Sequence, residues 1–193
     1  SEGMLGIVTE ITVKLLPKPE KAQVVMAAFD DIQMAGNAVA NVIGAGIIPA
    51  GMEMMDKLTT RAVEEFVHAG YNLDAEAILL CESDGTEEEV ADEIKRINEI
   101  MKKSGAVDIK TSHNETERLT FWAGRKAAFP AAGRISPDYY CMDGTIPRRN
   151  LARVLAGIEK LSIKYGLRCM NVFHAGDGNL HPVSYTHLRA HET

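Results

Sequence analysis

Residues 77–111, AILLCESDGTEEEVADEIKRINEIMKKSGAVDIKT, contain the pattern that decides the fold class. Ala77–Cys81 is an apolar run with the length of a buried strand. Thr86-Glu87-Glu88-Glu89 matches a capping box with acidic residues in the first turn, and it predicts a helix to about residue 103. Ala106–Thr111 then predicts another strand. This stretch therefore predicts a strand, a helix and a strand in direct succession.

The same near alternation continues on both sides of this stretch. Further strands are predicted at 22–29, 48–55, 139–142 and 167–173, and helices at 32–43, at 56–68 with Asp56 as N-cap, at 114–128 with an end near Pro130, and at 148–165 with Gly166 at the end. Such an order predicts an α+β domain of ferredoxin-like type, with an antiparallel sheet and helices on one face.

Both ends of the chain differ from this domain. Gly6–Leu16 is rich in β-branched residues and predicts a strand that ends at Pro17-Lys18-Pro19. Since the chain begins at Ser1 without a methionine, we expect a natural upstream part. Residues 183–193 resemble the translation of a sequencing-library adapter, so we expect a non-native tail and give His187 and His191 no functional weight. The expected organisation is 1–18, 19–182 and 183–193.

The composition excludes several classes of protein. The 193 residues are 46% hydrophobic and 25% charged, as in a globular protein, and the net charge of −6 argues against a nucleic-acid binder. The three cysteines form no close pairs, and no run suggests a membrane span or a signal peptide. We therefore expect a cytoplasmic protein whose contact with a membrane comes only through partners. A nicotinamide cofactor is not expected, because no G-x-G-x-x-G follows a strand.

The richest chemistry lies in HAGDGNLH, residues 174–181. Gly176 and Gly178 permit a tight loop that could bring the imidazoles of His174 and His181 to one point. Two such histidines suit a divalent, Zn-like metal, with Asp177 as the nearest candidate for orienting them. The spacing alone favours the alternative, a glycine-rich turn with satisfied histidines.

Other residues carry weaker evidence of a functional role. Arg125 could grip a carboxylate through two parallel hydrogen bonds, although most helix arginines are solvated. Of the adjacent Tyr139 and Tyr140, one is expected in the core, and Cys141 is expected to be a buried thiol. The Met-rich strand at 52–55 is expected to be core packing, with Glu53 as its odd member.

Four motifs together resemble one family. SEGMLGIVTE at 1–10, PAGMEMMD at 49–56, YYCMDGTIPR at 139–148 and HAGDGNLHP at 174–182 are similar, in the same order, to FAD-linked oxidases of the vanillyl-alcohol-oxidase type. Within it, the branch of glycolate oxidases and D-lactate dehydrogenases is the most similar. The resemblance covers essentially residues 1–182.

The resemblance implies that the chain comprises parts of two domains with different roles. Residues 1–18 would be the end of a FAD-binding domain, and residues 19–182 the cap domain that holds the substrate. Related dehydrogenases bind a divalent metal through the positions of His174 and His181, together with a glutamate further along, and a carboxylate through the position of Arg125. A substrate-binding lysine of some relatives is replaced here by Cys141. The expected cofactor contacts are Ser1, Glu2, Gly3, Leu5, Gly6, Ile7 and Val8.

The implied reaction is oxidation of a small 2-hydroxy acid, such as glycolate or D-lactate, to the 2-oxo acid. Arg125 would hold the carboxylate, a metal held by His174 and His181 would polarise the hydroxyl, and a histidine or a metal-bound base would accept its proton. Electrons would leave through a partner subunit or quinone, which would place the protein beside the inner membrane. Two alternatives remain: a same-fold enzyme for D-2-hydroxyglutarate or an alkylglycerone phosphate, and a cap module that only binds a ligand or partner.

Overall fold

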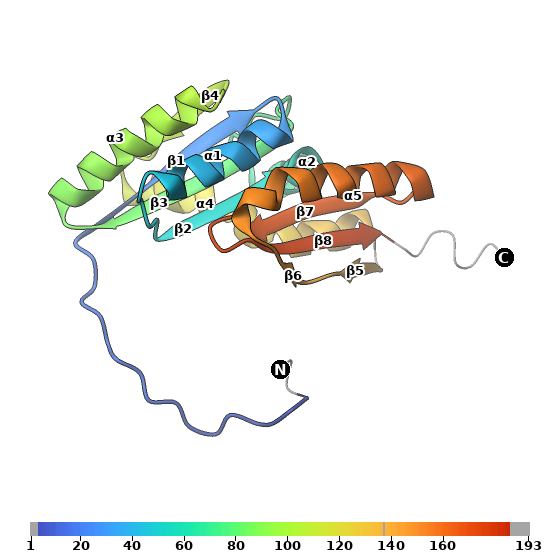
Figure 1. Ribbon diagram of the computed structural model, residues 1–193, viewed down its shortest axis with the longest axis horizontal. Helices are drawn as coiled ribbons and strands as arrows, with labels where there is room; N and C mark the ends of the chain where they lie inside the picture. Colours follow the sequence, from blue (N-terminus) through green and yellow to red (C-terminus); the bar gives the residue numbers. More distant parts are fainter. Residues whose placement is uncertain (1–3, 137, 186–193) are drawn as a thin grey trace.

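The computed structural model describes residues 4–136 and 138–185. Within these residues, eight strands form one antiparallel sheet that is flanked by five α-helices (Figure 1). In chain order the elements are β1 (Lys21–Phe29), α1 (Ile32–Gly44), β2 (Gly51–Asp56), α2 (Lys57–Val67), β3 (Ala77–Gly85), α3 (Glu87–Lys103), β4 (Asp108–Thr111), α4 (Glu115–Ile135), β5 (Tyr139–Cys141), β6 (Gly144–Thr145), the 3-10 turn η1 (Arg148–Asn150), α5 (Leu151–Tyr165), β7 (Cys169–His174) and β8 (Asn179–Tyr185).

The strand order brings distant parts of the sequence together. Neighbouring strands follow the order β4-β1-β3-β2-β7-β8-β5, and β6 pairs with β8. All of these pairs are antiparallel, as predicted. Because β2 and β7 are neighbours, the first and last thirds of the domain meet in the middle of the sheet.

Helices cover both faces of the sheet, so the prediction of helices on one face was wrong. Helices α1, α3 and α5 pack on the face formed by side chains such as Val25, Met54 and Leu79. Helices α2 and α4 pack on the opposite face, against neighbours such as Met55 and Leu80 (Figure 1). The physical reason is that the central strands are apolar on both sides, so that each face must be shielded from water.

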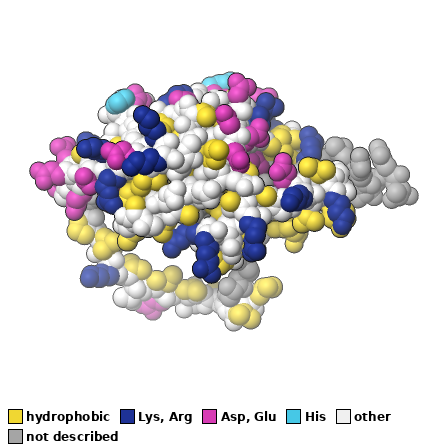
Figure 2. All heavy atoms as spheres, turned by 45° about the horizontal axis from the view of Figure 1, so that its top comes forward, with side chains coloured by type: hydrophobic (Ala, Val, Ile, Leu, Met, Phe, Trp, Pro, Cys, Tyr) yellow, Lys and Arg dark blue, Asp and Glu magenta, His cyan; other side chains and the backbone are white. Residues whose placement is uncertain are grey.

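The predicted strand at Gly6–Leu16 is absent, which is a second correction. In the described part of this segment the backbone forms no strand. Its large apolar side chains are between 67% and 89% exposed, and Figure 2 shows apolar side chains along this segment, below the body of the molecule. The residue preferences are those of a strand, but a strand also needs a partner to satisfy its backbone hydrogen bonds.

Helix α4 continues through Pro130 to Ile135, although the sequence predicted an end near the proline. A proline inside a helix removes one backbone hydrogen bond and costs roughly 3 kcal/mol. Small residues on both sides of it, Ala127, Ala128, Ala131 and Ala132, are buried against the sheet. Their burial offsets the lost hydrogen bond and keeps the helix continuous.

Several local predictions are confirmed. Thr86 and Glu89 form the capping box of α3, Asp56 is the N-cap of α2, and Gly166 ends α5 in a left-handed conformation. Strand β8 was not predicted. Its last three residues, 183–185, pair with β5 and β7, although we expected a tail from residue 183. His187 and His191 lie outside the described residues. None of the described helices is long and apolar enough to cross a bilayer.

Candidate active site

Glu53, His174 and His181 project from one face of the sheet because of strand register. Glu53 on β2 pairs with His174 on β7, and His181 on β8 pairs with Val172, two residues before His174. Val172 packs on the face covered by α4. Because side chains alternate along a strand, His174 faces the same side, and residues paired directly across two strands also share a face. The sheet thus presents one carboxylate and two imidazoles to helix α4.

A tight turn between β7 and β8 brings the two histidines close together. The backbone N–H groups of Asp177 and Gly178 both donate to the carbonyl of His174, at 3.1 Å each. Gly178 has a φ of 73°, and a Cβ there would collide with the carbonyl oxygen of Ile146. Only glycine suits this position, since other residues rarely adopt this φ. Gly176 has no positive φ, and its N–H donates to the Met52 carbonyl at 3.0 Å.

The two imidazole rings lie side by side. Their centroids are 5.2 Å apart and their planes are nearly perpendicular, at 86°. The His181 side chain is 15% exposed, and its Nδ1 lies 3.7 Å from Asp143 Oδ1. Burial lowers the pKa of His181, and the Asp143 carboxylate opposes this shift. A lowered pKa favours the neutral ring, which carries a lone pair for a proton or a metal.

Glu53 joins His174 to Arg125. One carboxylate oxygen, Oε1, lies 2.6 Å from His174 Nδ1, and the other, Oε2, accepts a hydrogen bond from Arg125 Nε at 2.8 Å. The side chains of Glu53 and Arg125 are only 12% and 11% exposed, whereas that of His174 is 44% exposed. Three side chains from β2, α4 and β7 therefore form one hydrogen-bonded chain that is accessible at the histidine.

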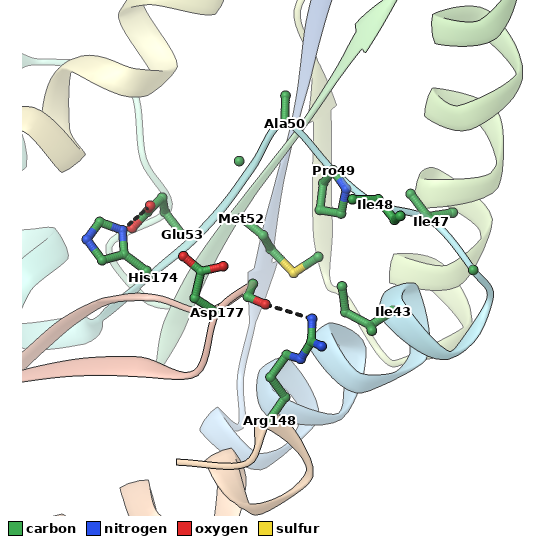
Figure 3. Close-up of a pocket in the computed structure, with 13 residues that line it drawn as sticks. Ile43, Ile47, Ile48, Pro49, Ala50, Met52, Glu53, Arg148, His174 and Asp177 are labelled. Atoms are coloured by element: carbon green, nitrogen blue, oxygen red, sulfur yellow. Dashed lines mark hydrogen bonds and ion pairs between the residues drawn. The ribbon is translucent and has the colours of Figure 1, made fainter. Parts of the chain in front are cut away.

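The sequence analysis missed the role of Glu53, and it assigned the orienting role to Asp177. Figure 3 shows the contact between Glu53 and His174, with Asp177 lying apart from the ring. The available signal was the single carboxylate within the apolar run of residues 52–55. A charged side chain on a buried strand needs a partner, because burial of an unpaired charge is expensive.

Helix α4 is anchored close to Arg125. Trp122 Nε1 and Arg118 Nη1 both donate to the Glu82 carboxylate on β3. The indole lies over Gly51, where a Cβ would be 3.2 Å from the ring. Arg125 follows Trp122 by about one helical turn, so these contacts hold the arginine next to Glu53 on β2.

A second anchor holds the same part of α4. The buried Tyr71 hydroxyl donates to the Phe121 carbonyl at 2.6 Å and accepts from the Gly124 N–H at 3.0 Å. Burial raises the pKa of this phenol, so it stays protonated. A Cβ on Gly124 would collide with the Tyr71 ring, so the close approach needs glycine here.

A cavity of about 560 Å³ adjoins the hydrogen-bonded chain. Glu53, His174 and Asp177 line its polar side, and Ile43 and Ile47 line its apolar side (Figure 3). Arg148 Nη1 donates to the Gly176 carbonyl at 2.9 Å and closes the cavity at the turn. The cavity is therefore mixed in character, with its polar groups gathered at the two carboxylates and the imidazole.

Two predictions about β5 were wrong. Tyr139 and Tyr140 are 37% and 65% exposed, so neither is in the core. Cys141 is exposed rather than buried. The reason is that β5 is an edge strand whose side chains are all exposed.

Of the expected cofactor contacts, Ser1, Glu2 and Gly3 lie outside the described residues, and Leu5, Gly6, Ile7 and Val8 are exposed.

The two histidines supply only part of a metal site. Among the described residues, no group of three or more histidine, cysteine or carboxylate side chains is arranged to hold an ion. His174 Nδ1 is taken by Glu53, which leaves Nε2 as the nitrogen that could coordinate. Two adjacent imidazoles fit part of a zinc-type ligand set, and such a set needs a further ligand.

Comparison with known proteins shows the family of the chain. The sequence profile of FAD linked oxidase C-terminal domains matches residues 18–193. The chain is 63% identical over 183 residues to the glycolate oxidase subunit GlcD of Escherichia coli, covering 95% of the chain and 37% of that protein. The corresponding subunit of Bacillus subtilis is 39% identical, with 98% and 40% covered. The mitochondrial D-lactate dehydrogenase of Arabidopsis thaliana is 28% identical, with 94% and 32% covered.

Solved structures of the same shape have little sequence in common with the chain. An alkyldihydroxyacetonephosphate synthase superposes with a TM-score of 0.66 at 14% identity, covering 89% of the chain and 38% of that structure. A p-cresol methylhydroxylase gives 0.64 at 15%, covering 91% and 41%. These similarities show the fold alone. The chain spans less than half the length of each of these relatives and structures.

Proposed function

Because the chain belongs to the family of FAD linked oxidase C-terminal domains, we propose that it is the substrate-binding part of a flavoprotein that oxidises a small 2-hydroxy acid. Glycolate and D-lactate are the proposed substrates, and the 2-oxo acid is the product. The observation that carries the proposal is the convergence of Arg125 and His174 on Glu53, with the His181 ring next to them.

Arg125 provides the carboxylate-binding group. Its Nε is bound to Glu53, so the outer end of the guanidinium, with its two Nη groups, can grip a carboxylate by two parallel hydrogen bonds. The low exposure of Arg125 strengthens such a contact, because water competes less. This is the group that a 2-hydroxy acid requires in addition to one that acts on its hydroxyl.

His174 and His181 provide the groups for the hydroxyl. Oxidation of the acid removes a proton from the hydroxyl and a hydride from the α-carbon. The lowered pKa of His181 keeps its imidazole neutral near pH 7, so that it can accept a proton or bind a cation. The chemistry that FAD supplies when bound is acceptance of the hydride. The chemistry that a divalent, Zn-like cation supplies at such a pair is polarisation of the hydroxyl.

The segment before β1 would meet the FAD-binding part of the flavoprotein. Residues 1–18 would complete that part, and 19–182 would form the cap domain. The exposed apolar side chains of residues 4–16 support a contact with another surface. Ser1, Glu2, Gly3, Leu5, Gly6, Ile7 and Val8 are the proposed cofactor contacts. Electrons would pass to partner subunits, as the name of the Escherichia coli relative, a subunit, suggests.

The first half of the domain is ferredoxin-like in this proposal. The units β1-α1-β2 and β3-α3-β4 interleave in the order β4-β1-β3-β2, as in that fold, with α2 as an addition. Helices α1 and α3 pack on one face of the sheet, and α2 and α4 pack on the face toward which Glu53 and His174 point. Helix α4 supplies Arg125.

A substrate panel on the intact flavoprotein tests the proposal. Anaerobic bleaching of the flavin is measured with glycolate, D-lactate, D-2-hydroxyglutarate and an alkylglycerone phosphate. Rapid bleaching by glycolate or D-lactate, with loss in Arg125→Ala, is the expected result. Bleaching by none of the four compounds would reject the proposal in favour of the binding module. A preference for D-2-hydroxyglutarate or the alkylglycerone phosphate would assign the other substrate class.

A further inference from the structure

We propose that Glu53 is a positioning residue, which fixes the tautomer of His174 and the orientation of Arg125 with its two carboxylate oxygens. The inference rests on the proposed function for the identity of the substrate, but its first test does not. Glu53 touches neither reacting atom in this scheme. It acts through the two side chains that do.

The first contact determines which nitrogen of His174 carries the proton. An ionised carboxylate only accepts hydrogen bonds, so at 2.6 Å the Nδ1 of His174 must be the donor. A neutral ring with its proton on Nδ1 has its lone pair on Nε2. Glu53 therefore turns the basic nitrogen of His174 away from the strand, where it can meet a hydroxyl proton or a cation.

The second contact determines which part of Arg125 is offered to the substrate. Glu53 Oε2 binds Nε, on the inner side of the guanidinium. The planar group is then fixed in rotation, with its Nη end directed away from the strand. Because both side chains of this pair are nearly buried, the orientation is held in a low dielectric.

The two contacts also couple the two halves of the site. In a 2-hydroxy acid the carboxylate and the hydroxyl are on adjacent carbons, so their binding groups must keep a fixed separation. Arg125 is on α4 and His174 is on β7, 49 positions apart in the sequence. Glu53, on β2, holds both at once, and so its two oxygens, together with the packing of α4, set their separation.

The neighbouring strand offers a matched comparison. Glu82 on β3 also binds groups of α4, Trp122 Nε1 and Arg118 Nη1, and its side chain is 14% exposed against 12% for Glu53. Glu82 contacts neither histidine in the described structure. The two carboxylates therefore differ in what they hold, while both brace the same helix.

The test is the tautomer of His174, measured by long-range ¹H–¹⁵N NMR on the 193-residue chain labelled in histidine. Spectra are recorded at about pH 8.5, above the ordinary titration of imidazole. The chain has six histidines, and a His174→Asn variant assigns the signal. The wild type is expected to show the proton on Nδ1. Glu53→Ala should move it to Nε2, and Glu82→Gln should leave it on Nδ1.

A kinetic measurement on the intact flavoprotein completes the test. Glu53→Gln keeps the shape of the side chain, but one of the two oxygens becomes an NH2 group, which cannot accept the hydrogen bond from His174 or from Arg125. We expect kcat/KM for the 2-hydroxy acid to fall about 10- to 100-fold, through a lower kcat and a higher KM. Melting temperatures of Glu53→Gln and Glu82→Gln show whether each variant is folded.

The outcomes separate this inference from the proposed function. If Glu53→Ala leaves the His174 proton on Nδ1, or if the wild type has it on Nε2, the positioning role is wrong even where turnover is normal. If the tautomer changes as expected while no 2-hydroxy acid is oxidised, the positioning of His174 stands and the proposed substrate is wrong.

Discussion

Glu53 Oε1 lies 2.6 Å from His174 Nδ1, although 121 positions separate the two residues in the sequence. The contact exists because β2 and β7 pair with Glu53 opposite His174. A shift of one residue in this register would turn one of the two side chains toward α1 and α5. The candidate site is thus a product of strand pairing more than of any one motif.

Arg125→Lys tests the proposed carboxylate contact. A lysine keeps the charge but lacks the planar fork, so one strong hydrogen bond is lost. We expect a loss of about 1.5–3 kcal/mol, about 10- to 100-fold in kcat/KM, mainly through KM. Steady-state kinetics of the intact flavoprotein measure this. Arg134→Lys, on the same helix but over the Phe66 ring, should leave KM unchanged. Equal effects of both variants would contradict the role of Arg125.

Gly178→Ala tests the turn that brings the histidines together. The position combines a φ of 73° with contact to the Ile146 carbonyl, so alanine strains the backbone and the packing. We expect a loss of at least about 2 kcal/mol in the free energy of unfolding. Urea denaturation measures it. Gly144→Ala is the control, because no atom lies within 4 Å of its Cβ position and its φ is not positive. A stable Gly178→Ala variant would show that the turn tolerates a side chain.

Gly124→Ala tests the anchor of α4 on Tyr71. The added methyl group would overlap the tyrosine ring and break its hydrogen bonds to the helix. We expect destabilisation of about 2–3 kcal/mol. In the same helix, Gly133 has only a Tyr139 ring atom at 4.0 Å from its Cβ position. Gly133→Ala should therefore stabilise by up to about 1 kcal/mol, because alanine is the better helix former. Thermal melts of both variants should shift in opposite directions.

The three cysteines should react with a thiol reagent in the order of their exposure and acidity. Cys141 is exposed, Cys169 is half-buried with its pKa raised to about 11, and burial raises the pKa of Cys81 to about 12. Partial burial and the nearby Asp143 also raise the pKa of Cys141. The thiolate is the reactive form. Because Cys81 and Cys169 stay protonated near pH 8 and Cys141 is the exposed thiol, Cys141 reacts first. Labelling followed by mass spectrometry measures the order. In denaturant the difference should vanish, and rapid labelling of folded Cys81 would refute its burial.

Most of the local structure could be predicted from the sequence. The periodicity of apolar residues, the capping box at Thr86, the cap at Asp56 and the glycine of the 174–181 turn depend on neighbours within a few positions, and each is present in the structure. The motif at 174–181 also indicated where to look for the site. Such signals are local, because they express the backbone preferences of a few residues.

Only the tertiary structure decided which side chains meet. It placed helices on both faces, continued α4 through Pro130, left residues 6–16 without a partner strand and gave His174 the carboxylate of Glu53 in place of Asp177. Each of these outcomes depends on the register of strands and on burial against residues far away in the sequence. The free energy of those long-range contacts outweighs the local preferences of the residues, and it cannot be deduced from a short stretch of sequence.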